Sequence, residues 1–531
     1  MSAFIKFCGA ARTVTGSCYW LRANDVSFLV DCGMFHGPKR LKQLNYDDFP
    51  FIPREIDFVL LTHAHIDHSG LVAKLIRKGF DGPVYATEGT RDLLSYMLPD
   101  SGYIQEQEVR YLNERNRRRG YPTVKPIYTR DDGVAALSSF RPVDYEQWIE
   151  PAPGVRARFW NAGHILGSAS IELAIDAGGD KPVSMLFSGD VGPEHKLFHP
   201  DPEGPAGLDC VVCESTYGGR EREALDPAGR RARFAEEVGA ALADEGLLLI
   251  PSFAVERTQE LLADLFALMD AGEIPSVPVF LDSPLAIRAT EVFAEHADEL
   301  EPGARAEAAF DHPNLRFSET VDDSKAIARF ASGAIILAAS GMCDAGRIRH
   351  HLKRCLWREN ATVMLTGFQA PGTLGRLLEE GAKSVRIFGE PVAVRARIRS
   401  IDLYSGHADG TELVDWIRAR APIGRKLFLT HGDAAAIDAL KGDLAAAGLD
   451  GDAIATPHLD DEFDLVENAF RPREAVIRRM PEDGIDRLDW HNALAALTLD
   501  LRARLDAAPD DAARERILAE LRETLERSAS G

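Results

Sequence analysis

Three histidines and one aspartate stand within six positions of this chain, at His63, His65, Asp67 and His68. They follow an apolar run that ends at Leu60, in a loop that leads into a predicted helix start. Side chains of an extended loop alternate sides, so their donor atoms can converge on one point. Neutral imidazoles beside a carboxylate are the ligands that zinc prefers. A polar loop capping a strand is the alternative, which suits one lone histidine better than this cluster.

Three protein ligands are enough for one catalytic zinc ion, so the surplus of ligands indicates a second metal. Three further residues could complete the cluster: His164 in NAGHILGS, Asp190 in LFSGDVG and His431 in FLTHGD. Each of them alone could be a turn residue or a helix cap. Because strand ends deliver their residues to one edge of a sheet, these groups can meet the first cluster.

The pattern of predicted strands and helices that must position these residues changes along the chain. Up to about residue 215, short β-type runs end in Asp, His or Glu, and they include SFLVDCG, DFVLLTHAH, PVYAT, ARFWNAGH, ASIELAI, VSMLFSGD and DCVVCES. Residues 105–120 and 131–137 have the pattern of helices. From 215 to 400, helices alternate with buried runs typical of parallel strands, among them GLLLIPSF, VPVFLD, GAIILAAS, ATVMLTG and SVRI. This second pattern predicts a doubly wound α/β unit.

Strand-end histidines return after residue 400, in DLYSGHADG and KLFLTHGD. This return indicates that the α/β unit, residues 215–400, is inserted into a metal-binding domain formed by residues 1–214 and 401–466. Residues 467–531 form an extension with leucines and an isoleucine spaced for two amphipathic helices. A helical hairpin folded onto its own chain is one interpretation of the extension. A dimer contact is the other, and we expect a homodimer.

The composition is that of an ordinary globular protein, since 45% hydrophobic and 27% charged residues exclude a disordered chain. The formal net charge of −22 counts against indiscriminate nucleic-acid binding by the whole surface. The N-terminus lacks a basic leader, and no apolar stretch approaches the roughly 18 residues of a membrane helix. We therefore expect a cytoplasmic protein without a membrane partner. Seven scattered cysteines, with Cys210 and Cys213 in one C-x-x-C, predict reduced, buried thiols.

Positions 63–68 match the H-x-H-x-D-H hallmark of the metallo-β-lactamase superfamily, which the chain resembles. The resemblance implies an α/β fold, namely an αββα sandwich carrying the inserted α/β domain and the C-terminal helical extension. It also implies two Zn²⁺ ions per chain with Asp190 bridging them. The other ligands would be His63, His65 and His164 for one ion, and Asp67, His68 and His431 for the second. Asp31, which ends the FLVDCG strand, would contact metal ligands without binding the metal and would thereby orient them.

Two such ions lower the pKa of a bridging water toward neutrality, which makes hydroxide available at pH 7. The departing alkoxide still needs a proton donor. Glu214 in ESTYGG and His407 in SGHADG stand at the two seams of the insertion, where they can meet above the metals. A carboxylate raises the pKa of an imidazole and fixes its tautomer, so His407 could protonate the 3′ leaving oxygen. We expect His407, Glu214 and the ligand Asp67 to be catalytic, and a turn histidine is the alternative for His407.

The order of Glu214, insertion, His407 and His431 resembles the β-CASP branch of the superfamily, which acts on nucleic acids. The insertion carries motifs that look like that branch: STYGG, PSFAVERTQE, DSPLA, SGMCDAGR and GFQAPGTLGR. Over about residues 3–440, the chain looks most like the nuclease subunit of the mRNA 3′-end cleavage machinery and its bacterial relatives. Histidine at position 431, where DNA-processing members carry valine, implies an RNA substrate. We expect this RNA to be single-stranded.

Glycine turns, hydroxyls and guanidinium groups of the insertion suit phosphodiester oxygens. We expect contacts with the RNA backbone from Ser252, Arg257, Ser340, Gly341, Arg347, Gly372, Thr373 and Arg376. At each position, a glycine turn that merely begins a helix is the alternative.

The sequence thus predicts a zinc-dependent ribonuclease that cuts RNA internally, with 5′-to-3′ exonuclease action as a second mode. A small-molecule hydrolase of the thioesterase or lactonase type is one alternative, but an insertion of about 185 residues suits a polymer better. A catalytically inactive RNA-binding scaffold is another alternative. Such a scaffold would lose ligands, whereas all seven predicted ligands are present here.

Overall fold

The computed structural model describes residues 3–178, 181–223, 225–301, 309–369, 372–465, 478–480, 501, 504–505 and 508–529. The chain divides into two compact units, the first of Met1–Met34 and Phe49–Arg479 and the second of Phe35–Asp48 and Met480–Gly531. Within the described residues, no helix is both long enough and apolar enough to cross a membrane.

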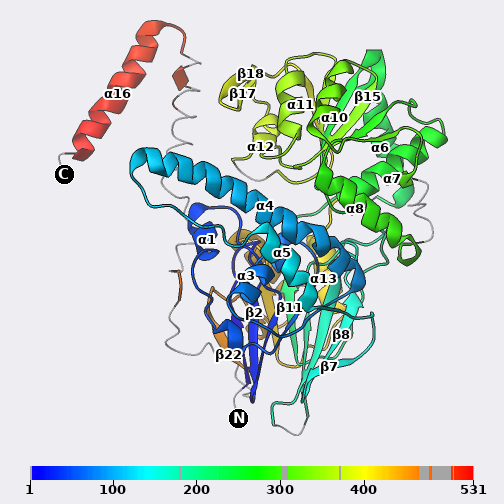
Figure 1. Ribbon diagram of the computed structural model, residues 1–531, viewed down its shortest axis with the longest axis vertical. Coiled ribbons are helices and arrows are strands. Elements are labelled where there is room, and N and C mark those ends of the chain that lie inside the picture. The colour runs from blue at the N-terminus through cyan, green and yellow to red at the C-terminus, as the bar shows by residue number, and fades with distance from the viewer. Residues whose placement is uncertain are drawn as a thin grey trace. The chain divides into compact units, whose positions relative to one another are not determined.

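Two seven-stranded sheets form the centre of the first unit (Figure 1). In spatial order, the first sheet contains β22 (Glu462–Asp464), β1 (Ala3–Phe7), β2 (Tyr19–Ala23), β3 (Val26–Val30), β4 (Phe58–Leu60), β5 (Val84–Ala86) and β6 (Phe140–Pro142). The second contains β21 (Ile454–Ala455), β20 (Lys426–Thr430), β11 (Cys210–Glu214), β10 (Val183–Phe187), β9 (Ala169–Ile175), β8 (Val155–Asn161) and β7 (Ile149–Ala152). Strands from before and after residues 215–400 therefore share each sheet.

The two sheets pack face to face through aromatic side chains. The ring centroids of Phe7 and Phe428 lie 5.1 Å apart, those of Tyr19 and Phe187 lie 5.3 Å apart, and each pair joins one sheet to the other. On β20, Phe428 faces this interior, whereas its neighbours Leu427 and Leu429 belong to a cluster with the helices on the other side. This alternation is what a strand with a two-residue period requires when both of its faces are covered.

Helices cover the outer faces of the sandwich. They are α2 (Ile66–Ser69), α3 (Val72–Arg77), α4 (Glu88–Arg119) and α5 (Arg130–Ala136), which follow strands of the first sheet, and α13 (Gly410–Arg418) and α14 (Ala434–Ala446) beside the second. Leu413 of α13 and Leu440 of α14 are fully buried against β11 and β20. The predicted αββα sandwich is confirmed.

The inserted unit is built on a six-stranded sheet in which every pairing is parallel. Its order is β14 (Leu315–Phe317), β13 (Val279–Leu281), β15 (Ala334–Ala338), β12 (Leu247–Pro251), β16 (Ala361–Leu365) and β19 (Arg397–Ser400). Its helices are α6 (Pro227–Leu242), α7 (Arg257–Asp270), α8 (Pro284–Glu295), α10 (Val321–Ala326), α11 (Ile348–Cys355) and α12 (Leu374–Glu379). The predicted parallel α/β unit is confirmed.

The central strand β12 shows why this sheet has helices on both faces. Leu247 and Leu249 join the apolar cluster of α11 and α12, whereas Leu248 and Ile250 join that of α6 and α7. All four side chains are fully buried. A strand buried on both faces reads as a continuous apolar run, which is the pattern of GLLLIP in the sequence.

Two details differ from the sequence-based prediction. The SVRI segment does not join the parallel sheet, because β17 (Ser384–Ile387) pairs antiparallel with β18 (Glu390–Ala393) in a separate hairpin. Its side chains alternate between exposed and buried, as expected for a ribbon with one covered face. The predicted helix at 105–120 is also only the second, mostly exposed half of α4, which begins at Glu88 after the cap residue Thr87.

All seven cysteines are free and buried, which confirms the prediction of reduced thiols. Cys210 and Cys213 lie on β11, whose five side chains are all buried. In the second unit, α1 (Lys39–Leu44) and α16 (Asp511–Ala529) are helical. The second predicted helix of the extension corresponds to α16, whereas most of the first lies outside the described residues. The domain boundaries drawn from the sequence stay predictions.

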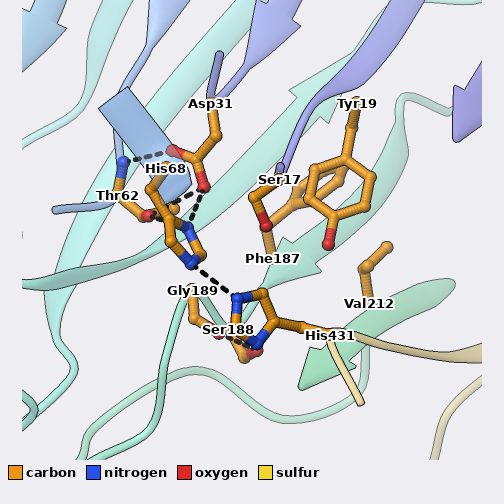
Figure 2. A pocket seen from close by; sticks show the side chains of 10 residues that line it. All are labelled: Ser17, Tyr19, Asp31, Thr62, His68, Phe187, Ser188, Gly189, Val212 and His431. Atoms are coloured by element: carbon orange, nitrogen blue, oxygen red, sulfur yellow. Dashed lines mark hydrogen bonds and ion pairs between the residues drawn. The ribbon is translucent and has the colours of Figure 1, made fainter. Parts of the chain in front are cut away.

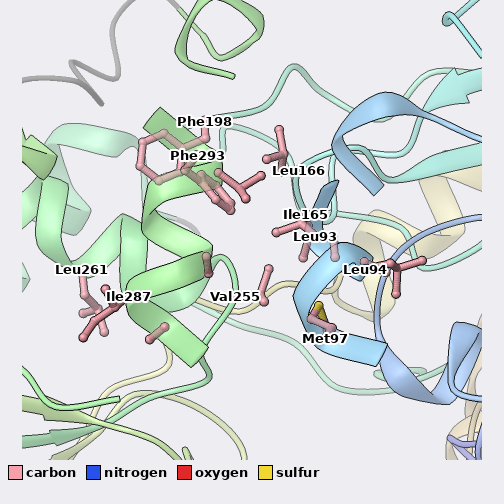
Figure 3. Close-up of a cluster of buried hydrophobic side chains, with 14 of the residues drawn as sticks. Leu93, Leu94, Met97, Ile165, Leu166, Phe198, Val255, Leu261, Ile287 and Phe293 are labelled. Carbon is pink, nitrogen blue, oxygen red and sulfur yellow. The ribbon is translucent and has the colours of Figure 1, made fainter. Parts of the chain in front are cut away.

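A continuous apolar core joins the insertion to the sandwich (Figure 3). It runs from Leu261 of α7 and Ile287 of α8 to Leu93 and Met97 of α4, and it includes Ile165, next to the predicted ligand His164. The insertion is therefore packed against the helix and the loop that flank the predicted site.

Candidate functional site

One edge of the sandwich collects every predicted metal ligand. The loop after β4 and the short helix α2 carry the first cluster, and the turns after β8, β10 and β20 carry His164, Asp190 and His431. Most of these side chains are buried, and His63 is fully so. Because β4, β10 and β20 run toward the same edge, residues hundreds of positions apart become neighbours.

His63, His65, His164 and Asp190 form the first group of potential ligands, with all donor atoms within 4.8 Å of one another. His65 Nδ1 lies 3.1 Å from His63 Nε2 and 3.0 Å from His164 Nε2. Asp190 Oδ2 lies 3.5 Å from His63 Nε2 and 3.6 Å from His164 Nε2. These distances place three imidazoles and one carboxylate around a common point.

Asp67, His68 and His431 form the second group, with the same limit on their mutual distances. His68 Nε2 and His431 Nε2 are 3.0 Å apart, and Asp67 Oδ2 is 3.5 Å from His431 Nε2. The other oxygen of Asp190, Oδ1, lies 3.3 Å from His68 Nε2 and 3.7 Å from His431 Nδ1. Asp190 therefore reaches both groups, one oxygen toward each.

The chemistry of this donor set fits divalent metal ions. Burial lowers the pKa of His65 to about 4, and burial together with neighbouring imidazoles lowers the pKa values of His63 and His164 well below the ordinary value. These rings are therefore neutral at pH 7 and offer nitrogen lone pairs. Asp190 Oδ1 is buried without a hydrogen-bond donor among the described residues. A buried carboxylate oxygen that accepts no hydrogen bond from the described part of the chain and lies between converging imidazoles is what a metal cation would satisfy.

Asp31 stands directly behind His68 (Figure 2). Its Oδ2 lies 2.7 Å from His68 Nδ1, and it also accepts hydrogen bonds from the amide and the hydroxyl of Thr62, at 2.8 and 2.9 Å. A carboxylate at Nδ1 leaves Nε2 of His68 as the lone-pair atom that faces His431. This is the position that the sequence predicted for a group orienting the ligands.

Two other candidate ligands have partners that sequence reasoning missed. His164 Nδ1 donates to the carbonyl of Gly406 at 2.5 Å, and His431 Nδ1 lies 3.2 Å from the Thr216 hydroxyl. Gly406 precedes His407 and Thr216 follows Glu214 by two residues, so both partners flank predicted residues. A backbone carbonyl leaves no signal in the sequence, whereas a hydroxyl beside Glu214 was a signal that could have been used.

Glu214 and His407 meet as predicted, beside Asp190. His407 Nδ1 lies 3.2 and 3.3 Å from the two carboxylate oxygens of Glu214, and 3.9 Å from Asp190 Oδ2. Glu214 is held by the amides of Val191, at 2.5 Å, and Thr216. Burial lowers the pKa of His407, but the Glu214 carboxylate outweighs burial and raises it above the ordinary value. The imidazole stays 21% exposed, so it can reach a ligand over the site.

The predicted phosphate-binding residues of the insertion form two groups, and the first group lies near the ends of neighbouring strands. Arg257 lies near the end of the insertion, since its Nε donates to the carbonyl of Tyr404, three residues before His407, at 2.9 Å. Ser252 is buried and accepts from the Thr258 hydroxyl, at 3.1 Å. Ser340 and Gly341 come after β15, which is the strand next to β12. These four residues come from neighbouring strand ends of the parallel sheet.

The side chains of the second group form hydrogen bonds or ion pairs with other residues of the insertion. Arg347 donates from Nη1 to Asp282 at 2.7 Å and to the Ser318 carbonyl at 2.7 Å. Arg376 pairs with Glu380 at 2.7 Å. Thr373 caps α12 by accepting from the amide of Arg376, at 3.2 Å, and Gly372 before it has a φ of +84°. The proposed contacts of these four residues with RNA stay predictions.

Three family descriptions match the chain. They are the metallo-beta-lactamase superfamily over residues 11–229, the Beta-Casp domain over 258–378 and the Zn-dependent metallo-hydrolase RNA specificity domain over 391–454. The last match covers His407 and His431, and the first covers the other candidate ligands. The matches confirm the resemblance drawn from the sequence motifs.

Among curated proteins, ribonuclease TTHA0252 of Thermus thermophilus is 35% identical over 445 residues, covering 83% of this chain and 95% of that protein. The transcription termination factor FttA of Methanosarcina mazei is 31% identical, covering 80% of this chain and 66% of that factor. An RNase J-like protein of Methanocaldococcus jannaschii is 29% identical, covering 81% and 92%. The chain therefore spans nearly the whole length of the first and third relatives and about two thirds of the second.

These matches, together with two groups of histidine and aspartate side chains that could bind metal on a sandwich interrupted by an α/β insertion, identify the family. The chain belongs to the β-CASP family of the metallo-β-lactamase superfamily.

Proposed function

We propose that this protein is a zinc-dependent ribonuclease that hydrolyses phosphodiester bonds of single-stranded RNA. The observation that carries the proposal is the position of Asp190. Its two oxygens face two separate groups of ligands, and Glu214 with His407 lies beside it under the insertion. A site with two metal positions and an adjacent acid–base pair suits phosphodiester hydrolysis.

Two zinc ions fit the donor set. One would be held by His63, His65 and His164, and the other by Asp67, His68 and His431, with Asp190 shared between them. When bound, such ions lower the pKa of water toward neutrality and offset the negative charge of the phosphate. The chain's own contribution is to turn the imidazoles toward the site, which Asp31, Thr216 and the Gly406 carbonyl do through their contacts with Nδ1.

His407 is the proposed proton donor. As the bond between phosphorus and the 3′ oxygen breaks, the leaving oxygen takes a proton from His407 Nε2, while Nδ1 keeps its contact with Glu214. Glu214 acts through this contact as a positioning residue, because it orients the ring and favours its charged form. We propose the ligand Asp67 as the third residue on which activity depends.

RNA is the proposed substrate because two of the three relatives described above are named for ribonuclease activity, and one matched family is described as an RNA specificity domain. His431 occupies the position at which the sequence resemblance separates RNA from DNA substrates. We propose internal cleavage as the main mode and 5′-to-3′ exonuclease action as a second one. A cytoplasmic location and a homodimer also remain proposals, and the exposed Leu518 on α16 is a candidate for the dimer contact.

The proposal is tested with purified protein and RNAs labelled at either end, bearing a 5′-hydroxyl or a 5′-monophosphate. We expect two zinc ions per chain and cleavage fragments whose labels report the internal and 5′-directed modes. His431→Ala and Asp67→Ala should abolish cleavage, whereas His195→Ala, at an exposed histidine, should not. Fully zinc-loaded protein that cuts none of these RNAs would contradict the proposal.

His407→Ala separates proton donation from metal binding. It should retain zinc and lose about 10²–10⁴-fold in turnover, the usual contribution of a general acid. A substrate with sulfur in place of the 3′ leaving oxygen needs no proton, so it should be cut equally well by the variant and the wild type. If the sulfur substrate is not rescued, the donor role is wrong.

A further inference from the structure

Two exposed phenylalanine rings, Phe253 and Phe368, lie at one edge of the parallel sheet, and we call them the aromatic pair. Phe253 follows β12 and Phe368 follows β16, and these strands are direct neighbours. The two rings are 40% and 38% exposed. Apolar rings gathered on adjacent loops beside a site usually meet a ligand or partner.

The loops that carry the aromatic pair are packed together. The side-chain amide of Gln369, the residue after Phe368, donates to the carbonyl of Gly341 at 3.1 Å. A Cβ added at Gly341 would meet the ring of Phe253 at 2.9 Å. Gly341, predicted from the sequence as a phosphate contact, therefore also leaves the room that the Phe253 ring occupies.

Guanidinium groups line the aromatic pair. The Arg257 guanidinium lies 4.9 Å from the centre of the Phe253 ring. Arg220 lies 5.4 Å from the centre of the Phe368 ring and 5.1 Å from that of Tyr217. Arginine held over an aromatic ring keeps a positive charge beside a stacking surface, which suits a nucleotide with its base and its phosphate.

A continuous series of contacts joins this surface to the proposed proton donor. The Tyr217 ring centroid is 5.7 Å from that of His407, and Arg220 bridges Tyr217 and Phe368. On the other side, Arg257 contacts Phe253 and also donates to the carbonyl of Tyr404, three residues before His407. The aromatic pair therefore lies where nucleotides next to the scissile phosphate would pass.

The charge of the protein favours stacking over general electrostatic attraction. A net charge of −22 repels a polyanion at long range, so binding needs local contacts that do not depend on total charge. Every base has an aromatic face, and stacking on protein rings tolerates any sequence. Paired bases inside a duplex cannot present their faces in this way.

We propose that Phe253 and Phe368 stack on two unpaired bases of the RNA strand and thereby select single-stranded substrates. This inference rests on the proposed ribonuclease function and adds the residues that recognise the bases. Arg220 and Arg257 hold the phosphates that link the stacked bases to the cleavage site.

The test is steady-state cleavage of a single-stranded RNA by the full-length, zinc-loaded protein. Phe253→Ala and Phe368→Ala should each raise KM by about 5- to 150-fold, the range that base stacking on one ring supports, with kcat unchanged. Phe253→Trp and Phe368→Trp should keep the wild-type KM, which shows that the ring itself is needed. Substrates with one base removed at successive positions should raise KM at two positions for the wild type and at neither for the double alanine variant.

Phe388→Ala is the matched control. This phenylalanine is 45% exposed and has Arg349 4.5 Å from its ring centre, but it lies on the separate β17–β18 hairpin. Its loss should leave KM unchanged. If the wild type cuts RNA while both alanine variants keep its KM, the stacking proposal is overturned and the ribonuclease function stands. If the wild type cuts no RNA, both proposals fall.

Discussion

Single groups behind the candidate ligands decide how the imidazoles face the candidate metal positions. Asp31, Thr216 and the Gly406 carbonyl each contact the Nδ1 atom of one candidate ligand, namely His68, His431 and His164. In each ring, Nε2 is left to point into the site. Such contacts fix both the tautomer and the ring orientation, so they matter for metal affinity although they never touch the metal.

Asp31→Asn tests this control at one residue. The amide keeps the size of the side chain but removes the charge behind His68, so metal affinity at the second group should fall roughly 10- to 100-fold. Zinc titration against a competing chelator measures the affinity. Asp282→Asn is the control, because Asp282 is equally buried and lies 2.6 Å from His351 in the insertion. Equal zinc affinity in Asp31→Asn and wild type would rule out this role.

Between elements, a buried cluster of charges ties helix α7 of the insertion to the loop that carries His164. Glu256, which precedes α7, lies 3.0 Å from Lys196 and 2.9 Å from His199, and it accepts from the amide of Leu166. Lys196 also donates to the carbonyl of His164, at 2.5 Å. The insertion thereby takes part in holding a candidate metal ligand.

Glu256→Gln should destabilise the protein, because it leaves the buried Lys196 ammonium without its carboxylate. Breaking a buried pair in this way costs about 3–5 kcal/mol. Glu237→Gln is the control: Glu237 is also buried, but its partner Arg399 is 51% exposed, so the loss should be below about 1 kcal/mol. Calorimetric melting temperatures compare the two variants. A smaller decrease for Glu256→Gln than for Glu237→Gln would contradict this account.

A second contact between elements depends on pH. His296, after α8, lies 2.9 Å from Asp92 of α4 and 2.7 Å from Glu299. Burial lowers the pKa of His296, but hydrogen bonds to the two carboxylates outweigh burial and raise it above the ordinary value of about 6.5. The stabilisation is therefore complete below that value and is lost as pH rises through the raised pKa.

His296→Gln should accordingly lower the melting temperature at about pH 6, where the imidazolium donates to both carboxylates. The gap from wild type should shrink by about pH 9, where both proteins lack the charge. Differential scanning fluorimetry at both pH values measures the gap. His195→Gln, at an exposed histidine 3.9 Å from Asp201, should show no such trend. A gap that stays constant or grows with pH would disprove the pH-dependent link.

Across the whole molecule, the features with local signals could be predicted from the sequence. Apolar runs ending in His or Asp marked strands β4, β10 and β20, and the spacing of positions 63–68 marked a metal site. The pairing of Glu214 with His407 followed from their places at the two seams of the insertion. Each of these predictions depends only on where a strand ends and on the direction in which it runs.

Features that depend on which distant segments pack together could not be predicted. The phosphate contact of Arg347 stays a prediction, but its hydrogen bond of 2.7 Å to Asp282, 65 residues earlier, had no signal in the sequence. The SVRI segment has the composition of a buried strand, but its partner is the adjacent β18 rather than the parallel sheet. The aromatic pair could not be found either, because ring exposure depends on how the loops after β12 and β16 pack.

A crystal structure with anomalous scattering at the zinc absorption edge would show whether Asp190 lies between two metal positions. We predict two peaks, one bounded by His63, His65 and His164 and the other by Asp67, His68 and His431, with one Asp190 oxygen facing each. A single peak, or zinc bound only away from these side chains in protein that cuts RNA, would contradict this prediction.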